Sequence, residues 1–189
     1  MTKIIIEHLD KRLWKWSLME YKHASELIGK ENIIFTNIKT EKSIEKLKDY
    51  GLIYKEKIEA LLKKENSKID FKKACILDPF AKETLKPSDK FDYLIIGGIL
   101  GDYPPQKRTR KELTSKLNFT ARNLGKVQMS TNTAAYVAWK IVNGFSLEKM
   151  KFKKLKIKIG KYQEVILPYR YLIENNDFVI PKGYIEMAK

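Results

Sequence analysis

Residues Asp92–Pro105 read DYLIIGGILGDYPP and give the strongest indication of the fold. Its first part, Tyr93–Ile96, is a continuous apolar run, which is typical of a strand buried on both faces of a parallel sheet. The strand runs directly into three glycines within five residues, Gly97, Gly98 and Gly101, which let a backbone approach a ligand closely. The segment is neither a Walker loop nor a GxGxxG fingerprint. A tight structural turn and a ligand-binding loop are both compatible with this spacing.

Short apolar runs on both sides of this stretch alternate with helical patterns. Strands are predicted at Lys3–Ile6, Ile33–Phe35, Cys75–Leu77 and Lys126–Met129, and helices at Trp14–Ile28, Ser43–Tyr50, Ile58–Leu62, Arg108–Leu117 and Thr133–Val142. This alternation predicts the α/β class, with a mostly parallel sheet flanked by helices. Ligands bind at the carboxyl ends of such strands, so Glu7, Asp78, Gly97–Asp102 and Ser130 are expected at one edge.

The last third of the chain has a different pattern. Leu155–Ile159 alternates strictly between apolar residues and lysine, which predicts a strand with one solvated face, and Gly160-Lys161 turns it back into Glu164–Leu167. The seven lysines between Lys149 and Lys161 either protect a sheet edge or form a docking surface for nucleic acid or an acidic partner. We therefore expect a domain at residues 1–147 and a lysine-rich β-hairpin extension at 148–189 packed on it.

Composition excludes several classes of protein. The 189 residues carry a net charge of +15, which favours a polyanionic partner such as RNA or a ribosome. One cysteine and two histidines exclude a Cys/His zinc site and a disulfide scaffold, so no metal is expected and a cytoplasmic location is the default. The longest apolar run, Leu94–Leu100, is too short to span a membrane, so no membrane partner is predicted.

A second informative segment is Leu124–Ala134, LGKVQMSTNTA, in which a predicted strand ends in Ser, Thr and Asn before an apolar helix. Their side chains are expected to cap the first helical amides, and a helix N-terminus also offers donors to a ligand. Between the two segments, Gln106–Lys126 holds seven basic residues and a single acid, Glu112. That stretch is either a solvated surface or a patch that faces the substrate.

Five further residues could belong either to a site or to the structural framework. Glu7 ends a strand and either reaches the site or fixes a loop. His8 has no partner acid at a known distance and is expected to be structural or solvated. Trp14 and Tyr21 are expected in the core, and Cys75 is expected to be inert inside a strand.

The two segments GGILGDYPPQKRT and NLGKVQMSTNTA together resemble the SPOUT methyltransferase superfamily, which has a trefoil-knotted α/β fold. Within it, the chain is similar to a branch whose eukaryotic member is a protein-arginine methyltransferase acting on a ribosomal protein. IIIEH at 4–8, MEY at 19–21, ILDP at 76–79 and LPYRY at 167–171 also fit that branch. The resemblance therefore spans most of the chain.

The resemblance implies S-adenosylmethionine as cofactor, bound in a bent shape against the knotted loops. Carried over residue by residue, the cofactor-binding positions are Leu77, Gly97, Gly98, Ile99, Gly101, Leu124, Gly125, Val127, Gln128, Met129 and Ser130. Methyl transfer needs the acceptor and the methyl group to be held at near-attack distance, and it requires no metal or covalent residue.

An arginine acceptor requires the site to stabilise a positive charge, because a guanidinium group stays protonated. A carboxylate must hold it and help release a proton. Asp102 is the first candidate for this catalytic role and Glu7 the second; either could instead be an acceptor that fixes a loop. Tyr103 stands where the branch leads us to expect histidine, so it either contacts substrate or packs. Substrate contacts are also predicted for Arg108 and Arg110.

The sequence thus predicts an S-adenosylmethionine-dependent methyltransferase that acts on an arginine of a ribosomal protein. The high positive charge fits an acceptor close to ribosomal RNA. It also fits two alternatives, an RNA (rRNA or tRNA) methyltransferase and a non-catalytic protein that binds RNA or ribosomes. A monomer and a homodimer are both compatible with the resemblance.

Overall fold

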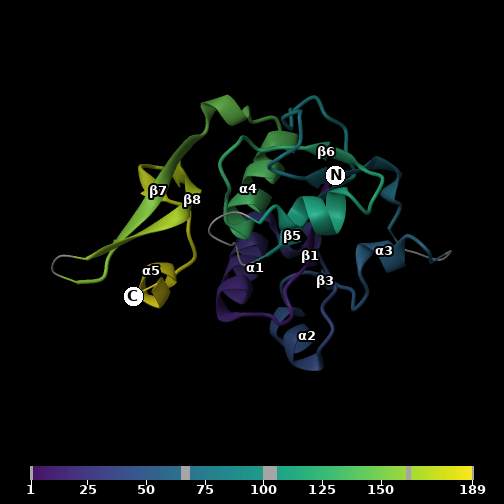
Figure 1. Ribbon diagram of the computed structural model, residues 1–189, viewed down its shortest axis with the longest axis horizontal. Helices are drawn as coiled ribbons and strands as arrows, with labels where there is room; N and C mark the ends of the chain where they lie inside the picture. Colours follow the sequence, from purple (N-terminus) through teal and green to yellow (C-terminus); the bar gives the residue numbers. More distant parts are fainter. Residues whose placement is uncertain (1, 65–68, 100–105, 161–162, 189) are drawn as a thin grey trace.

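The centre of the computed structural model, which describes residues 2–64, 69–99, 106–160 and 163–188, is a six-stranded sheet. Its strand order is β3-β2-β1-β5-β4-β6 and each neighbouring pair is parallel (Figure 1). The strands are β1 (Lys3–His8), β2 (Ile33–Thr36), β3 (Leu52–Ile53), β4 (Ala74–Leu77), β5 (Tyr93–Gly98) and β6 (Thr120–Arg122). The predicted parallel α/β sheet is confirmed.

Both faces of this sheet are covered. Successive side chains of a strand point to opposite faces, so each strand contributes to two cores. On β1, Ile4 and Ile6 belong to one core, and Ile5 belongs to the other. Helices α1 (Lys15–Ile28) and α4 (Thr131–Val142) cover the first face, and α2 (Glu41–Leu47) packs on its margin. The second face is covered by α3 (Ile58–Leu61), by the π-helix η3 (Arg110–Thr114) through Leu113, and by Leu117 after it. The 3₁₀ turns are η1 (Lys30–Asn32), η2 (Phe71–Lys73) and η4 (Leu147–Lys149).

The C-terminal residues form a separate antiparallel sheet that lies beside α1 and α4 (Figure 1). Its elements are β7 (Lys151–Lys158), β8 (Glu164–Glu174), β9 (Asp177–Phe178) and the helix α5 (Tyr184–Ala188). Leu155 and Ile157 point into a small core with Tyr171 and Tyr184, while the lysines of β7 are exposed. The predicted β-hairpin is confirmed, although its strands are longer than predicted and β9 and α5 were not expected.

Some local predictions are wrong. Residues 126–129 form a loop rather than a strand: Gly125 has a φ of +94°, and Met129 alone makes an isolated bridge. The sheet strand of this region is β6, which starts six residues earlier. Trp14 is not in the core; it precedes α1, is 39% exposed, and lies under the Arg12 guanidinium at 3.6 Å. Residues 100–105 lie outside the described ranges, so the trefoil knot stays a prediction.

Candidate functional site

A cleft of about 600 Å³, partly open to solvent, lies at the carboxyl ends of β4 and β5. Most of the predicted cofactor-binding residues line it: Leu77, Gly97, Ile99, Leu124, Gly125, Val127, Gln128 and Met129. The sequence did not single out Pro79, Ile96, Thr109, Thr131 or Ala134, which line it as well. The position is the one expected for a ligand site in a parallel sheet.

The two glycines that end β5 are required for different reasons. A Cβ atom at Gly97 would lie 3.0 Å from Thr109 Oγ1 and 3.2 Å from Ile99 Cδ1, so glycine keeps this part of the cleft open. A Cβ atom at Gly98 would lie 2.0 Å from the hydroxyl of Tyr21 on α1. Gly98 is absent from the cleft lining, and its side-chain position belongs to the core. The predicted cofactor contact of Gly98 stays a prediction, and packing against Tyr21 already explains the glycine.

The loop that forms the opposite wall of the cleft is held by the C-terminal sheet. The Arg170 guanidinium of β8 donates to the Leu124 carbonyl, and the Arg170 amide donates to the Gln128 carbonyl at 3.0 Å. The Gly125 amide donates to Asn123 Oδ1 at 2.8 Å. The shape of this wall therefore depends on β8, which begins some forty residues further along the chain.

The start of α4 is capped in an unexpected way. Ser130 occupies the N-cap position, but its hydroxyl bonds to Thr133 Oγ1 at 2.9 Å and makes no cap hydrogen bond. The Thr131 amide instead donates to Glu20 Oε2 at 3.0 Å, so the predicted side-chain cap is replaced by a carboxylate from α1. Ser130 also lies outside the lining of the cleft, so its predicted cofactor contact stays a prediction.

The carboxylate of Glu7 is at the predicted sheet edge, since Glu7 pairs with Gly97 in the strand register. It accepts hydrogen bonds from the Thr36 hydroxyl and, at 3.3 Å, from the Ile58 amide. Burial raises the pKa of Glu7, and these two hydrogen bonds oppose that rise. Glu7 is absent from the cleft lining, and its contacts are those of a residue that fixes β2 and α3 beside β1.

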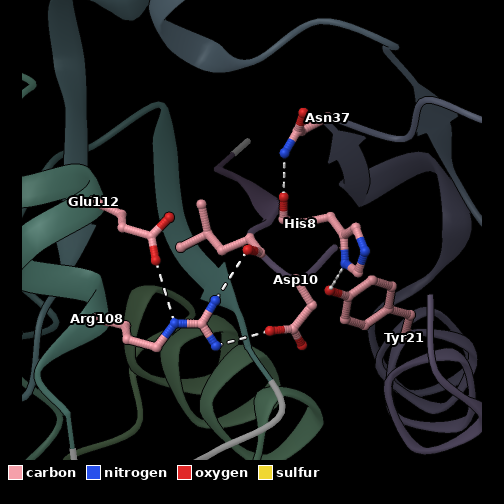
Figure 2. Close-up of polar contacts among 7 residues, drawn as sticks. His8, Asp10, Tyr21, Asn37, Arg108 and Glu112 are labelled. Atoms are coloured by element: carbon pink, nitrogen blue, oxygen red, sulfur yellow. Dashed lines mark hydrogen bonds and ion pairs between the residues drawn. The ribbon is translucent and has the colours of Figure 1, made fainter. Parts of the chain in front are cut away.

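Next to Glu7, His8 makes structural contacts. Its Nδ1 lies 2.9 Å from the Tyr21 hydroxyl, and its carbonyl accepts from Asn37 (Figure 2). Burial lowers the pKa of His8, which favours the neutral ring. Cys75 is buried in β4, where burial raises its thiol pKa to about 12, so it is the inert core residue that was predicted.

The two arginines predicted to bind substrate form ion pairs. Arg108 donates to Asp10 at 2.8 Å, to Glu112 at 3.2 Å and to the Leu9 carbonyl at 3.0 Å, which ties η3 to the loop after β1 (Figure 2). Arg110 donates to the buried Asp78 at 3.2 Å.

Another hollow, formed partly by the basic segment, adjoins the cleft on this side and has Lys107 and Lys126 in its lining. Both arginines line it too, so their predicted substrate contacts stay predictions.

Three predicted residues, Gly101, Asp102 and Tyr103, lie outside the described residues. Within the described ranges, no group of three or more His, Cys, Asp or Glu side chains could hold a metal ion. No helix in those ranges is long and apolar enough to cross a membrane.

Comparison with known proteins gives a consistent result over the whole chain. A family model described as protein arginine N-methyltransferase SFM1-like matches residues 3–189. Protein arginine N-methyltransferase SFM1 of Saccharomyces cerevisiae is 32% identical over 200 residues, covering 99% of this chain and 94% of the yeast protein. The crystal structure of the yeast enzyme complexed with SAM superposes with a TM-score of 0.89 at 31% identity, covering 100% of this chain and 90% of that one.

A more distant likeness concerns the fold alone. A Trm10 structure from Thermococcus kodakaraensis has a TM-score of 0.62 at 24% identity, over 79% of this chain and 96% of that one. Both structures are SPOUT methyltransferases, so the predicted SPOUT fold class is confirmed.

Proposed function

The chain belongs to the SFM1-like family of protein arginine N-methyltransferases, and we propose that it methylates an arginine of a ribosomal protein with S-adenosylmethionine as donor. The observation that carries this proposal is the cleft at the ends of β4 and β5. It is lined by the two segments that gave the resemblance, in a chain that matches the yeast enzyme from end to end. The yeast enzyme has been crystallised with SAM, SAH and MTA.

The residues of the cleft fit such a donor. Gly97 keeps one part of the cleft free of side-chain atoms, and the loop at 124–129 brings main-chain groups to the opposite wall. When bound, the donor supplies a methyl group on a positively charged sulfur. Apolar side chains such as Leu77, Ile96 and Met129 would surround the nucleoside and exclude water around it.

The acceptor end of the reaction requires a carboxylate. A guanidinium group keeps its charge at ordinary pH, so one of its protons must leave when a nitrogen gains a methyl group. Asp102 is proposed for this catalytic role because it follows the glycine segment in the sequence. The contacts of Glu7 with Thr36 and Ile58 favour a role in holding the strands together for this second candidate.

The charge of the chain supports an acceptor that lies beside ribosomal RNA. The net charge is +15, and the lysines of β7 are exposed on the C-terminal sheet. A ribosomal protein provides an arginine and a polyanionic surface together. A cytoplasmic location follows from this acceptor and stays a prediction, and a monomer and a homodimer are both compatible with the proposal.

The same charge favours one alternative, methylation of RNA itself. A +15 protein binds polyanions readily, whereas a basic arginine-containing peptide alone would be repelled. This alternative shares the donor cleft and differs only in the acceptor.

The deciding experiment incubates the protein with methyl-labelled S-adenosylmethionine and unmodified ribosomes, and then digests the product with protease or with RNase. We expect protease alone to release the label and amino-acid analysis to recover it as methylarginine. Label released by RNase alone would overturn the proposed acceptor in favour of RNA.

A further inference from the structure

A second hollow, of about 650 Å³, lies between α1, the start of α4 and β8. We propose that this hollow binds the guanidinium group of the acceptor arginine, with the Glu20 carboxylate as its counter-ion. The inference rests on the proposed function, because it identifies where the acceptor of that reaction binds. Glu20 and Trp16, which line the hollow, were given no role from the sequence.

Glu20 is a buried carboxylate with no cation beside it among the residues that the structure describes. Its side chain is 5% exposed, and no lysine or arginine in the described parts of the chain forms an ion pair with it. Oε2 accepts from the Thr131 amide at 3.0 Å, and Oε1 accepts from the Tyr184 hydroxyl at 3.0 Å. Each carboxylate oxygen can accept more than one hydrogen bond, so both retain capacity for a donor that enters the hollow.

Capping a helix with a buried carboxylate costs free energy, because the charged group must be removed from water. Serine, threonine or asparagine caps a helix without any charge to desolvate, and such residues stand at Ser130–Thr133. Burial raises the pKa of Glu20, and only the hydrogen bonds from Thr131 and Tyr184 oppose the rise. A guanidinium in the hollow would offset that penalty, because a buried carboxylate is stable when it is paired and hydrogen-bonded.

The walls of the hollow suit a planar cation. Trp16, Tyr169 and Tyr184 line it, and the rings of Trp16 and Tyr184 pack edge to face with centroids 4.7 Å apart. Guanidinium groups stack on aromatic faces, and their five N–H donors match carboxylate oxygens. Aromatic walls around one acidic group favour arginine over a nucleotide, whose phosphates the carboxylate would repel.

The hollow adjoins the donor cleft. Ile99, Gln128 and Met129 line both spaces. Thr131 lines the donor cleft, and its amide is bonded to Glu20 at 3.0 Å. A group held by Glu20 is therefore next to the wall that the two sites share, as transfer between two bound reactants requires.

The first test replaces Glu20 by glutamine, which keeps an oxygen for the Thr131 amide but removes the charge. We expect kcat/KM for ribosomes to fall about 100-fold through a higher KM, as loss of a desolvated charge pair does. Affinity for S-adenosylhomocysteine, measured by calorimetry, should stay within about 3-fold of wild type. The control is Glu26→Gln, an exposed glutamate on the same helix, which should leave both values unchanged.

A second test is independent of turnover. N-acetylarginine amide and N-acetylcitrulline amide differ in the charge of the terminal group, and their binding to the full chain in the presence of S-adenosylhomocysteine is followed by ligand-detected NMR. Wild type should bind the arginine compound and not the neutral one, and Glu20→Gln should lose this preference. Trp16→Leu should weaken arginine binding about 10-fold, whereas Trp14→Leu, outside the hollow, should not.

The outcomes separate this inference from the proposed function. Label recovered in RNA would overturn the ribosomal-protein acceptor whatever Glu20 does. Methylarginine formed equally by wild type and Glu20→Gln, with equal arginine binding, would leave the proposed function intact and refute the hollow as the acceptor site. If Glu20→Gln fails to bind S-adenosylhomocysteine, the Trp16→Leu and Trp14→Leu pair decides the question instead.

Discussion

The donor cleft and the acceptor hollow share a wall but are built in different ways. The cleft is lined mainly by two continuous segments around Gly97 and Gly125, and most of its lining residues are glycine or apolar. The hollow is made of side chains from α1, from the loop before α4 and from the C-terminal sheet, and its central bond joins residues 164 positions apart. A site built from local turns leaves a contiguous motif in the sequence, whereas a site built from distant side chains leaves none.

The variant that should lose the most activity, Asp102→Asn, separates catalysis from acceptor binding. Asp102→Asn should lower turnover about 100-fold or more while donor affinity stays within a few-fold, because the carboxylate acts on the charge of the acceptor. The acceptor KM should change little, in contrast with Glu20→Gln. Steady-state kinetics with ribosomes, together with calorimetry for S-adenosylhomocysteine, measure both quantities. Near-normal turnover would remove Asp102 from the reaction and leave Glu20 as the strongest remaining candidate.

The sequence predicted the locally built features of the molecule better than the features built from distant residues. The parallel sheet was predictable, because apolar runs report on local backbone structure. The residues proposed for the donor cleft were inferred from the family resemblance of two continuous segments, and most of them line one cleft. Glu20 was noticed only as part of MEY, since nothing local indicates that it would meet Thr131 and Tyr184. The strand predicted at 126–129 is wrong because Arg170, far along the chain, bonds to Leu124 and Gln128 and holds the segment as a loop. Only the contact of Asn123 with Gly125 is local.

The next largest change is expected when each of the two glycines that end β5 is replaced by alanine and the two variants are compared. Gly98→Ala should destabilise the protein by about 2–3 kcal/mol, because the new methyl group would overlap Tyr21 in the core. Gly97→Ala meets the ends of Thr109 and Ile99, which can shift, so it should cost less stability and instead weaken donor binding about 10-fold. Urea denaturation and calorimetry measure the pair. The reverse assignment of effects would place Gly98 at the donor.

A smaller effect is expected where the C-terminal sheet supports the donor cleft. Arg170→Met keeps much of the side-chain length but loses the hydrogen bond to the Leu124 carbonyl. Loss of one charge-assisted bond to a loop should weaken donor binding by about 1–2 kcal/mol, or roughly 5- to 30-fold. Lys154→Met, at an exposed position of β7 that pairs with Arg170, serves as control and should leave donor affinity unchanged. Equal affinities of wild type and Arg170→Met would show that the loop holds its shape without β8.

The smallest change is expected at the contact between α1 and α4, both of which border the acceptor hollow. His23 Nδ1 lies 2.9 Å from the Asn132 side-chain amide, and burial lowers the pKa of His23 to about 4, compared with 6.5 when unfolded. Between these two values the unfolded chain binds a proton that the folded chain does not, so stability should fall as pH drops from 6.5 towards 4. After allowance for partial exposure, the loss is about 1–2 kcal/mol.

His23→Gln keeps an amide for Asn132 and removes the titration, so this variant should lack that part of the loss. Glu7 and Glu20, whose pKa values burial raises, act in the opposite direction, because the folded state binds their protons more readily as the pH falls. Both carboxylates are present in wild type and variant, so their contributions cancel when the two proteins are compared. Urea midpoints at pH 7.5 and pH 4.5 give the difference. Equal losses in the two proteins would mean that His23 is protonated in the fold, and that the α1–α4 contact tolerates a charge beside the acceptor hollow.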